Sequence, residues 1–244
     1  MLKETFYLDG VNADSVGIQL QNAMEFSEPV PIVERQSVPG KNGDLIFDTG
    51  SFENRTGTAN CFALRESCVE RSIRSINRFL LGTANRAKYR KLKTSDDPEH
   101  YWLARVENGA RIEQRLRTLA PFELSFDCKP QRFLEEGNTV IEATNGGIIY
   151  NKYGFSALPF ITVYGTGIGT LTISSSRTDS TVKFWRLDRM AYIDSEIQNA
   201  LLIYGYEDPM IQTDKFPVLG DGENYISWDG GIERVEIEPR WWEL

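Results

Sequence analysis

Short apolar or alternating runs, separated by glycine, asparagine, aspartate and proline, dominate this chain. Runs of this length bounded by turn residues predict β-strands. In the first half the predicted strands span residues 16–20, 32–38, 45–48, 57–63, 87–94, 101–106 and 119–126. In the second half they span residues 139–142, 147–150, 160–164, 170–174, 181–186, 190–193, 201–204, 225–228 and 234–237. The pattern therefore predicts a mainly β protein, and the spacing of turns in the second half is typical of an antiparallel sandwich.

One segment, residues 65–81, follows a helical period instead. Its apolar positions form a single stripe, which consists of Val69, Ile73, Ile76 and Leu80. Ser67 with Glu70 fits a capping box at the start of the segment, and Gly82 fits a C-terminal stop. We expect one amphipathic helix that lies on a sheet.

Two glycine-containing segments are predicted to be turns. Asn42-Gly43 lies between two predicted strands and supplies the positive φ angles that a tight hairpin turn needs. Gly165-Thr166-Gly167-Ile168-Gly169 superficially suggests a phosphate-binding loop, but such a loop must lead into a helix. Because the strand-like residues 171–173 follow, we expect a hairpin turn there too.

The charge of the chain is distributed unevenly. Among 244 residues, 27 are basic and 35 acidic, so the net charge is −8. Residues 1–134 hold 19 basic and 18 acidic residues, whereas residues 135–244 hold 8 and 17, a net of −9. This break, together with a polar link at residues 129–138, predicts two domains, 1–134 and 135–244. The excess of acid disfavours a general nucleic-acid binder, since phosphate contacts need a basic surface.

Residues that could carry chemistry are few. Cys61, Cys68 and Cys128 are widely spaced and the chain has one histidine, so neither a zinc site nor any other metal or cofactor site is expected. The cysteines are interpreted as reduced core residues of a protein made in the cytosol. His100 follows Pro98 in a predicted turn, which favours a solvent-facing loop residue over a catalytic triad member. There is no signal peptide pattern and no apolar stretch long enough to span a bilayer, so no membrane partner is expected.

Two other functions stay open on the residues alone. A pair of carboxylates could hydrolyse a glycan, although none of the 35 acids stands in a recognisable motif. The second half is also rich in aromatic residues, which suit either a core or a sugar-stacking platform of a carbohydrate-binding module. The candidates for such a platform are Tyr153, Phe155, Phe160, Tyr164, Phe184, Trp185, Tyr192, Tyr204, Tyr206 and Trp228.

Several strings, taken in order, resemble the distal tail (Dit) proteins of siphophages and prophages. The first is the stretch 38–45, with Pro39-Gly40, Lys41 and Asn42-Gly43, followed by 48–55, which ends in Asn54-Arg55. In the family this segment reads as Pro-Gly, a basic residue, Asp-Gly and an Asn-Arg pair, so Asn42 stands here where aspartate is common. The later strings lie at residues 89–92, 95–98, 122, 130, 216–219, 222–226 and 238–242. The resemblance covers essentially the whole chain.

The resemblance implies an N-terminal β-sandwich with one amphipathic helix and a protruding hairpin, and a C-terminal galectin-like jelly-roll β-sandwich. It implies a virion structural hub at the tail tip, made in the host cytoplasm and without enzymatic activity. The expected partners are five further copies of the chain in a hexameric ring, the major tail tube protein, the tail-associated lysin or tip protein, and receptor-binding proteins. Because residues 135–244 contain no histidine, the usual galectin sugar site is not expected.

The surfaces that meet partners are expected to include one basic run and the chain end. The basic run consists of Arg86, Lys88, Arg90, Lys91 and Lys93. Its side chains alternate between the two faces of a predicted strand, which suits either an exposed edge strand whose charges prevent further strand pairing or a surface for an anionic partner. Trp241-Trp242 is costly to expose, so residues 239–244 are expected to pack on the domain interface or return to the first domain. The expected ring or partner contacts are Arg55, Arg86, Lys88, Arg90, Lys91, Trp241 and Trp242.

Overall fold

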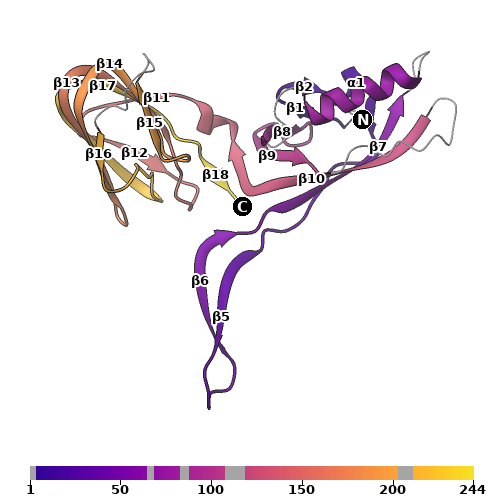
Figure 1. The fold of residues 1–244 in the computed structure, drawn as a ribbon, viewed down its shortest axis with the longest axis horizontal. Helices are drawn as coiled ribbons and strands as arrows, with labels where there is room; N and C mark the ends of the chain where they lie inside the picture. Colours follow the sequence, from indigo (N-terminus) through magenta and orange to yellow (C-terminus); the bar gives the residue numbers. More distant parts are fainter. Residues whose placement is uncertain (1–3, 65–68, 83–87, 108–118, 203–210) are drawn as a thin grey trace. The chain divides into compact units, whose positions relative to one another are not determined.

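The computed structural model describes residues 4–64, 69–82, 88–107, 119–202 and 211–244. Contacts within the chain group it into two compact units, Met1–Arg132 together with Leu244, and Phe133–Glu243. The expected boundary lies between residues 134 and 135. Both units are built mainly from strands, which confirms the predicted mainly β class (Figure 1).

Apart from β5 and β6, the strands of the first unit join in one continuous sheet, to which the short C-terminal strand β18 is added. Its order is β2-β1-β8-β9-β10-β7-β3, with β4 on β7 and β18 on β10. The bounds are β1 Phe6–Leu8, β2 Val11–Asn12, β3 Ile18–Leu20, β4 Glu25–Phe26, β7 Arg55–Leu64, β8 Arg90–Thr94, β9 His100–Val106, β10 Leu119–Leu134 and β18 Trp242–Glu243. A short 3-10 helix, η1 (Ala13–Val16), lies between β2 and β3.

The predicted helix is present as α1 (Val69–Leu81). Ile76 and Leu80 of the predicted stripe are buried, and the ring of Phe79 lies 6.1 Å from that of Phe6 on β1. Gly82 adopts φ 67° and donates its backbone N–H to Arg78 O at 3.0 Å, so the glycine stop is confirmed. The capping-box serine, Ser67, lies outside the described residues.

The predicted hairpin is a separate two-stranded sheet, β5 (Pro31–Ser37) and β6 (Asp44–Phe52), that projects from the first unit (Figure 1). The register pairs Ser37 with Asp44, so residues 38–43 form the loop at its tip. Gly40 and Gly43 both adopt φ 81° there, a conformation that favours glycine, whereas Asn42 does not have a positive φ. The predicted tight turn at Asn42-Gly43 is therefore wrong, because the strands separate already at Ser37 and Asp44 and a longer loop joins them.

The second unit also has one continuous sheet, in the order β11-β17-β13-β14-β15, with β12 on β17 and β16 on β14. A 3-10 helix, η2 (Glu135–Asn138), precedes it. The strands are β11 Ile141–Ala143, β12 Gly147–Asn151, β13 Phe160–Ser175, β14 Asp179–Asp194, β15 Asn199–Leu202, β16 Ile211–Thr213 and β17 Gly222–Glu238. Side chains from both halves of the long strands share one core, because bulged strands can bend around it.

The glycine segment 165–169 corrects a prediction. It is not a hairpin turn but a bulge inside β13, where the register with both neighbouring strands shifts. A Cβ on Gly165 would lie 2.0 Å from Gly231 O of β17. Glycine is therefore needed for the close approach of two backbones, and the predicted strands 160–164 and 170–174 are one strand. The predicted strands 181–186 and 190–193 are likewise one strand, β14, and its pairing with β13 is irregular. The predicted strands 225–228 and 234–237 are also one strand, β17, which continues through Gly230-Gly231.

The segment 129–138, predicted to link the two domains, contains the division between the two units and has regular structure, because β10 continues through Pro130 to Leu134 and η2 follows directly. The ladder between β10 and β7 ends at Cys128, so Pro130 removes no hydrogen bond from it. His100 begins β9 rather than facing solvent: its side chain is 12% exposed, and its Nδ1 lies 2.7 Å from Asp97 Oδ1. Arg132 pairs with the same carboxylate at 2.7 Å, which holds Asp97 and His100 in place.

Candidate functional site: the hairpin and its base

The hairpin exposes apolar side chains on both of its faces. In the register, Ile46 lies opposite Arg35 and Phe47 opposite Glu34, so the two residues point to opposite faces. Ile46 is 64% exposed and Phe47 52%, and Ile32 is also exposed. A two-stranded sheet alone is only marginally stable in water. Exposed apolar side chains on such a sheet are the feature expected of a surface that meets another protein.

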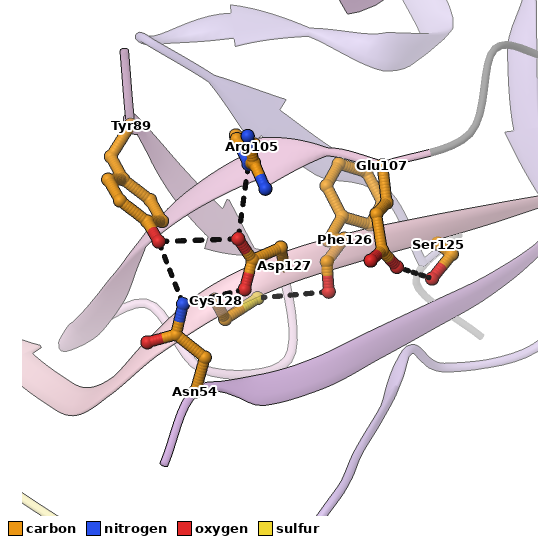
Figure 2. Close-up of polar contacts among 8 residues, drawn as sticks. All are labelled: Asn54, Tyr89, Arg105, Glu107, Ser125, Phe126, Asp127 and Cys128. Carbon is orange, nitrogen blue, oxygen red and sulfur yellow. Dashed lines mark hydrogen bonds and ion pairs between the residues drawn. The ribbon is translucent and has the colours of Figure 1, made fainter. Parts of the chain in front are cut away.

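A polar cluster fixes the base of the hairpin to the sheet of the first unit. Asn54, two residues past β6, donates from Nδ2 to Asp127 Oδ1 of β10 at 2.7 Å and to the Tyr89 hydroxyl at 2.8 Å (Figure 2). Tyr89 in turn donates to Asp127 Oδ2 at 3.3 Å. Arg105 of β9 donates to the same oxygen at 3.1 Å (Figure 2). One carboxylate thus gathers donors from three segments that are distant in sequence.

Arg55 secures the other side of the base. It begins β7, is 9% exposed, and donates from Nε to Ser27 O at 2.7 Å. Ser27 and Thr56 are also joined by two hydrogen bonds of 2.9 Å: Ser27 N–H donates to Thr56 O, and Thr56 N–H donates to the side-chain Oγ of Ser27. Burial lowers the pKa of the Arg55 guanidinium. The Asn-Arg pair singled out in the sequence therefore anchors both ends of the hairpin.

The basic run contacts its own unit. Arg90 pairs with Asp9 at 2.7 Å and donates to the carbonyl oxygens of Phe79 and Leu80, at the C-terminal end of α1, where a cation is favoured. Lys91 Nζ lies 4.1 Å from the centroid of the Tyr101 ring. Lys88 is exposed, and Arg86 lies outside the described residues. Of the described members of this group of expected contacts, Lys88 is the one that the structure leaves on the surface.

The two C-terminal tryptophans pack on side chains of the second unit. Trp241 is 6% exposed and belongs to the core of the second unit. The Trp242 ring stacks on Phe155 at 4.5 Å, and its Nε1 donates to Ser156 O at 3.0 Å. The apolar surface of both rings is thus covered within the unit that they end.

Two open cavities lie in the second unit. One, of about 400 Å³, is lined by Tyr164, Gly165, Thr166, Arg189, Glu233 and Arg234. The other, of about 330 Å³, is lined by Glu136, Thr139, Ile141, Tyr150, Lys152, Tyr153 and Trp241. Within the described ranges, no three His, Cys, Asp or Glu side chains are grouped so that they could hold a metal ion. In the same part of the chain, no helix has the length and apolar character to cross a membrane.

The sequence does not single out Asp127, and Tyr89 enters there only as the first residue of the string 89–92. Asp127 alternates with Phe126 and Cys128 on a strand, which reads as an ordinary outward position. The only local signal was the Asn-Arg pair, and it does not indicate the partner of Asn54, because that partner lies 73 residues further along.

Comparisons with known proteins agree with this architecture. Residues 13–128 match the family model of the phage tail protein RIFT-related domain. No curated protein sequence matches the chain. Among solved structures, the chain is similar to the Dit protein (gp 19.1) of SPP1, described as a paradigm of the hub adsorption apparatus in phages that infect Gram-positive bacteria. The TM-score is 0.72 at 15% identity, over 96% of this chain and 97% of that one. Residues 13–128 therefore match the RIFT-related domain of phage tail proteins, and the chain as a whole has the fold of the SPP1 Dit protein.

Proposed function

We propose that this protein is a structural hub at the distal end of a phage tail, where the first unit forms a hexameric ring. The observation that carries the proposal is the anchored hairpin with exposed apolar side chains on both faces. A closed ring needs two different complementary patches on each subunit. The hairpin supplies one of them, and its fixed base keeps it in one orientation toward the neighbouring copy.

The same ring would join the tail tube protein on one side to the tail-associated lysin or tip protein on the other, with receptor-binding proteins attached. The family match and the likeness to a hub protein support this role. The near-zero net charge of residues 1–134 lets copies approach without strong repulsion, and Lys88 is a candidate contact at the ring or with a partner. The function proposed is binding and not catalysis.

The experiment is a measurement of mass in solution by light scattering and analytical ultracentrifugation. The purified chain is expected to form a hexamer, and the double variant Ile46→Ser, Phe47→Ser is expected to shift it toward the monomer. The matched control is Ile197→Ser, since Ile197 is also 64% exposed but lies in the second unit. A chain that stays monomeric at every concentration and in the presence of its tail partners contradicts the proposal, and so does equal disruption by both changes.

A further inference from the structure

We propose that the second unit binds an uncharged saccharide in the cavity of about 330 Å³ beside β11 and β12. This site goes beyond the hub function and does not depend on ring formation. Its volume lies within the range of small-ligand pockets. The lining combines aromatic rings with one ion pair, which is the combination that a sugar needs, because a sugar ring offers apolar C–H faces and a rim of hydroxyl groups.

The aromatic part of the site is layered from the core to the surface. Trp241 belongs to the core, and the ring of Tyr153 lies 6.2 Å from it at an angle of 41°. Tyr150, near the end of β12, is 65% exposed. An aromatic ring with this exposure can stack on the C–H face of a sugar and keep its hydroxyl group in water.

The polar part consists of a donor and an acceptor side by side. Lys152 Nζ lies 3.2 Å from Glu136 Oε1, and both side chains are more than half exposed. Neighbouring hydroxyl groups of a sugar can donate to the carboxylate and accept from the ammonium group. Lys152 Nζ also lies 5.1 Å from the centroid of the Tyr153 ring, so the ion pair and the aromatic floor belong to one site.

Buried contacts hold this site in shape before any ligand arrives. Asn151, between Tyr150 and Lys152, is fully buried and donates from Nδ2 to Phe155 O at 2.8 Å and to Leu219 O at 3.3 Å. Its Oδ1 accepts from Tyr153 N–H at 3.1 Å. A fixed turn lowers the entropic cost of binding, which matters for a small ligand.

Charge indicates which saccharides fit. Residues 135–244 carry a net charge of −9, so the unit repels polyanionic polymers. The other cavity, which Tyr164 lines, is less suitable, because the ring and the hydroxyl group of Tyr164 already have partners within the protein. The Arg234 guanidinium lies 4.0 Å from the centroid of the Tyr164 ring, and the Tyr164 hydroxyl donates to Glu236 at 2.8 Å.

The test uses the full chain with glucose, galactose, N-acetylglucosamine and their β-linked trisaccharides, with dextran sulfate as the anionic probe. Binding is measured by saturation-transfer NMR and calorimetry at roughly 10 mM sugar, which detects the millimolar affinities of small ligands. At least one neutral trisaccharide is expected to bind. Tyr150→Ala and Lys152→Ala are each expected to weaken it about tenfold or more, which corresponds to the loss of one good contact.

The matched control is Tyr225→Ala. Tyr225 is 51% exposed, lies on β17 opposite Ile148 of β12, and is not part of the cavity lining. It is expected to leave the affinity within about twofold. The proposal is overturned if no neutral saccharide binds, if dextran sulfate alone binds, or if Tyr225→Ala weakens binding as much as Tyr150→Ala. The mass of Tyr150→Ala in solution should equal that of the parent, so failure of this site and failure of the ring are separate results.

Discussion

Asn54 Nδ2 lies 2.7 Å from Asp127 Oδ1, and this hydrogen bond joins the end of the hairpin to the strand that runs through the first unit. The contact explains how a two-stranded sheet with little core of its own can project from the first unit at a defined point. Its energetic weight can be measured directly, because neighbouring polar contacts on β10 offer controls.

Asn54→Ala is expected to lower the free energy of unfolding by about 1–3 kcal/mol, since it leaves the half-buried Asp127 carboxylate without its closest donor. Urea denaturation measures the loss, and hydrogen exchange should become faster in residues 31–52. The control is Ser125→Ala. Ser125 lies on β10, as Asp127 does, and the change removes an exposed hydrogen bond of 3.2 Å from Ser125 to Glu107 (Figure 2). An equal loss from both changes contradicts an anchoring role for Asn54.

Gly137→Ala is expected to destabilise the second unit strongly. The new Cβ would lie 2.4 Å from the backbone nitrogen of Trp241. Arg240 N–H donates to Gly137 O at 2.8 Å, so the two segments cannot separate to make room without losing this hydrogen bond. We expect a cost of about 3 kcal/mol or more from overpacking.

The matched change is Gly154→Ala, at φ 77° with no atom within 4 Å of the new Cβ. It should cost only the roughly 1–2 kcal/mol of left-handed strain. Thermal unfolding followed by tryptophan fluorescence suits both variants, because Trp185, Trp228, Trp241 and Trp242 report the second unit. If Gly137→Ala proves as mild as Gly154→Ala, the close approach is not tight in solution.

Removal of residues 239–244 is expected to lower the melting temperature of the second unit, because Trp241 fills its core and Trp242 covers Phe155. Trp241→Ala alone should cost about 3–5 kcal/mol, in the range of large core truncations. The control is Trp185→Ala, since that ring is 45% exposed and its loss should cost much less. A deletion variant that melts with the parent would show that the chain end contributes nothing to this core.

Burial raises the pKa of the Cys61 and Cys128 thiols to about 12, and the neighbouring Asp127 adds to the effect at Cys128. In a Cys68→Ser variant, neither thiol of the folded protein is expected to react with Ellman's reagent at pH 8, whereas both should react after denaturation. Reaction of the folded protein at the rate of the unfolded one would contradict the burial of these thiols.

The same shift predicts the direction of a pH effect on stability. Unfolded thiols lose protons above pH 9 while the folded ones keep theirs up to about pH 12. The folded state then binds more protons, so stability falls as the pH rises through this window, by about 1.4 kcal/mol per pH unit for each thiol. Cys128→Ala should reduce this slope relative to the parent by one thiol's share, as measured by urea denaturation at each pH.

Local signals in the sequence were sufficient for the elements whose conformation depends on near neighbours. The stripe that includes Ile76 and Leu80 determines α1, since residues three and four apart share one face of a helix. Gly82 ends it, because the left-handed conformation there costs glycine nothing. The positive φ of Gly43 and the mainly β class follow from equally local preferences, whereas the length of the loop at the hairpin tip does not.

Tertiary structure decided the rest. The glycines at 165–169 are compatible with a turn or a bulge, and the approach of Gly231 from another strand selects the bulge. Pro130 is compatible with a link or a strand, and the end of the β7 ladder at Cys128 permits the strand. The sequence could indicate that Asn54 and Trp241 matter, but their partners depend on how distant strands pair. Pairing is a property of the folded sheet, and no short window of residues contains it.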